Sequence, residues 1–111
     1  MNQLDTFILC EYKTDRLWVI VRAEIKNGCL EISGHDLSGT PKQYFGMSEF
    51  EYWYKFDEAN TECLIALLAK EGGDIKNLLY ENFSGLEGCE KLMAFCNANA
   101  VEYRYSSWHT D

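Results

Sequence analysis

Apolar side chains occupy every odd-numbered position along residues 17–26, and they alternate with Trp18, Ile20, Arg22, Glu24 and Lys26. A period of two residues is typical of a strand that is buried on one face. Asn27-Gly28 follows directly and favours a type I′ turn, because both central residues of that turn need positive φ. The alternation then resumes at residues 29–34. The pattern predicts an antiparallel hairpin formed by residues 17–26 and 29–34.

The period changes within residues 49–70. Four aromatic side chains alternate there with two glutamates, a tryptophan and a lysine, which predicts a strand over residues 49–56 with one aromatic face. From Ala59 the apolar positions recur at helical spacing, and Asp57 stands where an N-cap is expected. A helix is therefore predicted from Glu58 to Lys70, with Cys63 on its apolar stripe.

The other predicted elements are shorter. They are a first strand over residues 7–12, helices over residues 75–82 and about 86–97, and a closing strand over residues 101–105, while residues 34–46 hold three glycines and the only proline and predict an irregular loop. Strands followed by helices indicate an α+β fold. We expect a single domain over residues 1–111, in which a mainly antiparallel sheet of four to five strands carries about three helices on one face.

The charge balance disfavours several classes of partner. The chain has 10 basic and 18 acidic residues, a net charge of -8, whereas proteins that bind nucleic acid or anionic membranes rely on Lys and Arg. No apolar run approaches the length of a membrane span, and the N-terminus lacks the basic region and the small-residue cleavage site of a signal peptide. Five cysteines without paired spacing indicate free thiols, so we expect a cytoplasmic protein.

Few residues suggest catalysis. His35 and Asp36 could form a general base with its orienting carboxylate, but neighbours in extended chain usually point apart. Cys63, Cys89 and Cys96 lie on apolar helical stripes, as buried structural thiols do. The chain has only two histidines and no phosphate-binding loop. We therefore expect no catalytic residue, no metal and no cofactor, and a protein that is not an enzyme.

The segment of residues 49–62 is both acidic and aromatic. Its five acidic residues against one lysine give a local charge of -4, half of the net charge. The positive end of the helix dipole accounts for the acids after residue 56, but not for Glu49 and Glu51, which share a strand face with Trp53. An exposed tryptophan among carboxylates is typical of a protein-binding anchor, although Trp53 could instead pack under a helix or loop. With the long loop, the predicted partner-binding residues are Glu49, Glu51, Trp53, Glu58, Glu62, Asp36 and Tyr44.

Three stretches carry a resemblance to a known group of proteins: RLWVIVRAEIKNGCLEISGHDL, SEFEYWYKFDEANTECL and NFSGLEGCEKLMAFCNANAVEYRY. In layout and composition they resemble small acidic immunity proteins of bacterial contact-dependent growth-inhibition systems. Such proteins bind and neutralise a cognate toxin domain, often a basic nuclease. The resemblance implies an inhibitor that occludes the active site of an electropositive toxin; it assigns no site residue. A non-enzymatic adaptor or structural domain explains the composition equally well.

Overall fold

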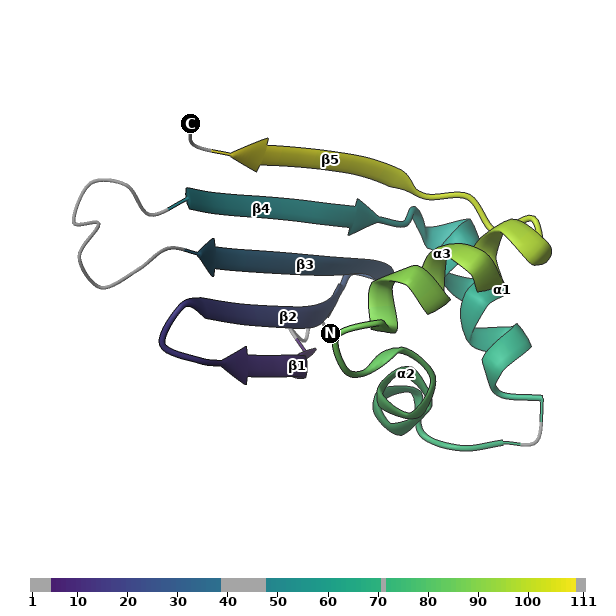
Figure 1. The fold of residues 1–111 in the computed structure, drawn as a ribbon. Helices are drawn as coiled ribbons and strands as arrows, with labels where there is room; N and C mark the ends of the chain where they lie inside the picture. The colour runs from purple at the N-terminus through teal and green to yellow at the C-terminus, as the bar shows by residue number, and fades with distance from the viewer. Residues whose placement is uncertain (1–4, 39–47, 71, 110–111) are drawn as a thin grey trace.

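A computed structural model describes residues 5–38, 48–70 and 72–109 (Figure 1). Five strands form one antiparallel sheet in the order β1-β2-β3-β4-β5, and three helices separate β4 from β5. This architecture confirms the predicted α+β class. The elements are β1 Asp5–Lys13, β2 Leu17–Lys26, β3 Cys29–Ser38, β4 Ser48–Lys55, α1 Glu58–Leu68, α2 Ile75–Phe83, α3 Gly88–Ala98 and β5 Arg104–His109.

The predicted hairpin is confirmed, and its second strand is longer than predicted. Asn27 and Gly28 have φ values of 55° and 79°, as a type I′ turn requires. Strand β3 continues to Ser38, so the prediction of an irregular loop was wrong for residues 34–38. Pairing on both sides, with β2 and with β4, satisfies the backbone groups of these residues and outweighs the low strand propensity of Gly34. Residues 39–47, including Tyr44, lie outside the described residues.

The helices cover one face of the sheet. Figure 1 shows them gathered at one end, with the strands extending beyond them. Every buried apolar residue of the sheet belongs to the face that meets the helices, which identifies this face as the core side. The sheet contributes Leu9, Val19, Val21, Ala23, Leu30, Ile32 and Tyr54 to the core, and the helices contribute Leu64, Leu79, Phe83, Leu92 and Cys96.

Helix α1 is rotated relative to its predicted apolar stripe. Asp57 is the N-cap, as predicted, and its carboxylate accepts the N–H three residues on at 2.8 Å. The buried positions of the helix are Thr61 and Leu64, whereas Cys63 is exposed, so its predicted burial was wrong. The hydroxyl oxygen of Thr61 accepts the backbone N–H of Leu30 at 2.9 Å. Because a buried N–H without a partner costs about 1–3 kcal/mol, this contact favours the orientation in which Thr61 faces the sheet.

The closing strand begins three residues later than predicted. The backbone N–H of Val101 donates to the carbonyl of Cys96 at 3.0 Å, so Val101 completes the end of α3 instead of joining the sheet. Tyr103 then packs on the core beside Phe56, with ring centroids 5.5 Å apart. Strand β5 spans Arg104–His109, pairs only with β4, and is exposed at every residue. The sheet therefore ends in a solvent-exposed edge strand.

Candidate functional site

One face of the sheet is left open by the described helices, and we call it the open face. Residues directly opposite each other on paired strands point to the same side, so the register determines its membership. The register confirms the predicted face shared by Glu49, Glu51 and Trp53 on β4. The open face also carries Ile8, Trp18, Ile20, Arg22, Ser33, His35, Leu37, Ser106 and Trp108.

All three tryptophans of the chain lie on the open face, on strands β2, β4 and β5. Trp108 is 49% exposed, and Trp18 and Trp53 are half-buried. The indole N–H of Trp18 donates to Glu11 at 3.3 Å, and the ammonium of Lys13 lies 4.5 Å from the centre of the Trp18 ring. Aromatic side chains held partly exposed on rigid strands are typical of protein-binding surfaces.

Charges on the open face are balanced in number but not in position. Lys55 on β4 and Arg104 on β5 lie at the helix end of the sheet. The ammonium group of Lys55 lies 4.0 Å from the carboxylate of Glu31. The opposite end carries Glu49 and Glu51. The acidic residues of the face are Glu11, Glu24, Glu31, Glu49 and Glu51, and the basic residues are Lys13, Arg22, Lys26, Lys55 and Arg104.

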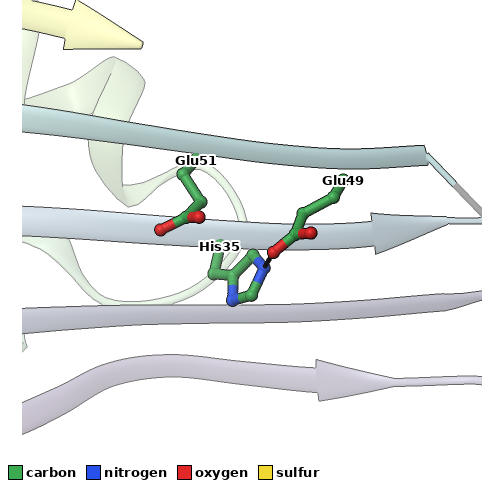
Figure 2. A group of neighbouring side chains, drawn as sticks. All are labelled: His35, Glu49 and Glu51. Atoms are coloured by element: carbon green, nitrogen blue, oxygen red, sulfur yellow. Dashed lines mark hydrogen bonds and ion pairs between the residues drawn. The ribbon is translucent and has the colours of Figure 1, made fainter. Parts of the chain in front are cut away.

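His35 joins the two glutamates of β4 in one cluster, which Figure 2 shows. His35 on β3 is directly opposite Glu51, and Glu49 is its diagonal neighbour on the same face. The imidazole Nε2 lies 2.6 Å from the Oε2 atom of Glu49. One donor atom from each residue lies within 4.8 Å of the others. Ile20 on β2 and Trp108 on β5 stand opposite the two ends of the His35–Glu51 pair and flank the cluster.

The structure brings together only part of the predicted partner-binding set. Glu49 and Glu51 lie near one end of β4, whereas Glu58 and Glu62 are exposed on α1, beyond its other end. The seven residues from Glu49 to Lys55 alone span about 20 Å of extended chain. Asp36 lies on the core side of the sheet. The predicted acidic residues of the partner-binding set are therefore divided between two places.

His35 and Asp36 do not form a pair. His35 is directly opposite Ile20 and Glu51 on the open face, whereas Asp36 is directly opposite Val19 and Phe50 on the core side. The carboxylate beside the imidazole comes from β4 instead. Sequence reasoning missed this pair because its partners are 14 residues apart and meet only through the β3–β4 register. The alternation along β4 could have revealed the pair if the predicted strand of residues 29–34 had been extended to include His35, because the two strands would then have been paired at this point.

Several titratable side chains lie together on the core side, below α3. Burial raises the pKa of the Asp36 carboxyl, and its Oδ1 atom is buried without a hydrogen-bond partner among the described residues. Burial also raises the pKa of the Cys10 and Cys89 thiols, and the nearby Asp36 charge adds to both shifts. The pKa of Cys89 reaches about 11. Tyr52, half-buried between them, has its pKa raised mainly by burial. These thiols are protonated and unreactive at neutral pH, which argues against a nucleophilic role.

We expect the protein to lose stability between pH 9 and pH 11. Burial raises the pKa of Cys89 and of Cys96 from an ordinary 9.0 to about 11. The folded state therefore holds these protons more tightly than the unfolded state, so their contribution is complete below pH 9 and is lost as pH rises toward 11. Urea unfolding at pH 7 to 10.5 measures the effect. A Cys96→Ala variant should show a shallower decline than the parent protein, and an equal decline would contradict this origin.

A surface hollow of about 360 Å³ lies where β4 meets α1 and the start of β5. Lys55 and Arg104 provide two positive charges, while Asp57 and Glu102 provide two negative ones. The carboxylate of Asp57 is also engaged in capping α1. This balance of charges gives the hollow no preference for an anion or a cation. The other lining residues are Phe56, Asn60 and Tyr103.

Comparisons with models of protein families, with curated proteins and with solved structures found no match to this chain. None of the described helices combines the length and the apolar character that crossing a membrane requires.

Proposed function

We propose that this protein is an immunity factor that binds a cognate basic toxin domain through the open face and blocks its active site. It acts by binding and not by turnover, in the cytoplasm of a bacterium. The observation that supports the proposal best is the placement of all three tryptophans on the one sheet face that the described helices do not cover. Burying partly exposed tryptophans against a partner is a common source of binding energy.

The anchors of this interface are Trp108 and Trp53, on the two neighbouring strands β4 and β5. Trp108 has the most exposed indole, and it is directly opposite Glu51. Glu49 and Glu51 lie on the same side and would meet the Lys and Arg side chains of a basic partner. The net charge of -8 would steer such a partner toward the protein at long range.

The separated acidic residues Glu58 and Glu62 contribute differently in this proposal. They are exposed on α1, beyond the helix end of β4, and so would speed encounter without entering the buried centre. Tyr44 and Asp36 remain predicted partner contacts that rest on the sequence alone. Asp36 on the core side could reach a partner only at the rim of the sheet.

The alternative is an adaptor or structural domain whose partner is not a toxin. The same open face would serve an adaptor, so the two functions differ in the partner and not in the surface. A toxin partner must inhibit growth when it is produced alone, whereas an adaptor partner need not. Protection of cells from the partner therefore separates the two functions.

The experiment combines co-purification with a growth assay. The protein of the gene directly upstream is produced with and without this protein, and growth, complex formation and binding rates are measured. Protection together with a stable complex would support an immunity factor. A neighbouring protein that is harmless, or one whose toxicity persists although this protein is folded and present, would contradict it.

Variants then locate the interface. Trp108→Ala and Trp53→Ala should each cost about 2 kcal/mol of binding, mainly through faster dissociation. Glu49→Lys combined with Glu51→Lys should mainly slow association and flatten its salt dependence. Glu81→Gln on the exposed side of α2 is the matched control and should change neither rate. Protection that is indifferent to all the open-face variants would place the interface elsewhere.

A further inference from the structure

The geometry points to a metal site on the open face: we propose that His35, Glu49 and Glu51 bind one divalent transition-metal ion, with Zn²⁺ as the representative ligand. The three side chains come from neighbouring strands β3 and β4 and lie close together on one face of the sheet, and Figure 2 shows His35 in contact with Glu49 and Glu51 beside it. This inference concerns the isolated protein and does not depend on the partner proposed above.

The spacing of the donor atoms fits a three-ligand site. Nε2 of His35 lies 2.6 Å from Oε2 of Glu49. One donor atom from each of His35, Glu49 and Glu51 lies within 4.8 Å of the other two. Donors that hold a tetrahedral zinc ion at about 2.0–2.2 Å stand about 3.4 Å apart. Binding an ion therefore needs adjustment of the two glutamate side chains, which their strands hold only at the backbone.

The donor types select the class of metal. One imidazole nitrogen and two carboxylate oxygens are ligands that Zn²⁺, Co²⁺, Ni²⁺ and Mn²⁺ accept, whereas Mg²⁺ and Ca²⁺ prefer oxygen alone. Two carboxylates also cancel the charge of a divalent ion. Three protein ligands leave a coordination position for water on the solvent side, because the side chains of His35 and Glu49 are 35% and 32% exposed.

The surroundings suit a bound ion better than a scattered group of surface carboxylates would. Ile20 on β2 is directly opposite His35, and Trp108 on β5 is directly opposite Glu51, so apolar side chains stand on both sides of the cluster. An apolar surround lowers the local dielectric and strengthens the attraction between the ion and its ligands. The rigid pairing of β3 with β4 also holds His35 opposite Glu51 before any ion binds.

Metal titration of the purified, reduced protein tests the proposal. We expect one Zn²⁺ or Co²⁺ per chain by calorimetry, and no comparable binding of Mg²⁺. His35→Gln and Glu51→Gln should each weaken binding more than about tenfold. Glu31→Gln, on the same face of β3 but at the other end, is the matched control and should leave the affinity unchanged. Unfolding midpoints without metal establish that each variant is folded.

Two further measurements exclude binding by the thiols. A Co²⁺ complex at this site should show weak visible bands without the near-ultraviolet band of a thiolate, and Cys63→Ser should bind as the parent does, since Cys63 is the exposed cysteine. Bound Co²⁺ should quench the fluorescence of Trp108, and Trp108→Phe should remove most of that quenching. Absence of stoichiometric binding, a thiolate band, or full binding by folded His35→Gln and Glu51→Gln would overturn the proposal.

Discussion

Replacing Gly88 by alanine is expected to destabilise the protein by about 3 kcal/mol or more, at the upper end of overpacking costs. A Cβ atom at this position would lie 1.8 Å from the backbone carbonyl oxygen of Phe83. Gly88 is buried at the start of α3, and Phe83 is the last residue of α2 and is only 3% exposed. Because the obstacle is backbone and not a movable side chain, relief requires the two helices to separate and leaves a gap in the core.

Helix propensity alone makes the opposite prediction for this substitution. Alanine is favoured over glycine within a helix by about 1 kcal/mol, so an uncrowded site would give a more stable variant. Urea unfolding of Gly88→Ala and the parent protein measures the difference directly. Lys91→Ala, at an exposed position of the same helix, is the control and should change the free energy of unfolding by less than about 0.5 kcal/mol. A stabilised Gly88→Ala variant would show that α2 and α3 are not in this close contact.

The contrast at Gly88 illustrates which parts of the fold local sequence could predict. Element types and the hairpin followed from period and turn chemistry, because those signals act within a few residues. The sequence interpretation treated Gly88 only as a weak helix former, since its reason for being glycine lies in another helix. Cys63 was misplaced for the same kind of reason: the orientation of α1 follows a hydrogen bond between Thr61 and Leu30, 31 residues away in the chain.

The candidate site was predictable to a similar extent. Alternation along β4 was enough to place Glu49, Glu51 and Trp53 on one face. It could not supply the residues that join them from other strands, because these are determined by sheet order and register. The sequence interpretation found no partner for His35, since it expected its neighbour Asp36 to point away, and it ended the closing strand at residue 105, before Trp108. The register sets His35 and Trp108 on either side of Glu51. Strand pairing across the chain is the information that single-sequence patterns lack.

A second glycine, Gly34, lies on the core side of the same strand pair β3 and β4. Replacing it by alanine is also expected to lower the free energy of unfolding. Gly34 is directly opposite Tyr52 on β4, and a Cβ atom would lie 2.0 Å from Cζ of the Tyr52 ring. The ring therefore lies over the glycine and packs between Phe50 and Tyr54, with centroid distances of 5.3 and 6.1 Å. Gly34→Ala must displace the ring, at a cost of about 1–3 kcal/mol.

A double-mutant cycle identifies the Tyr52 ring as the cause. In a Tyr52→Ala background the space above Gly34 is free, so Gly34→Ala should then cost much less than in the parent protein, with a coupling of about 1–3 kcal/mol. Urea unfolding of the four proteins gives this coupling. Additive effects would mean that the ring does not lie over the glycine.

Because His35 follows Gly34 on the opposite face of β3, displacement of β3 from β4 would also separate His35 from Glu51. Folded Gly34→Ala should therefore bind Zn²⁺ more weakly than the parent, and the Tyr52→Ala background should restore part of that affinity.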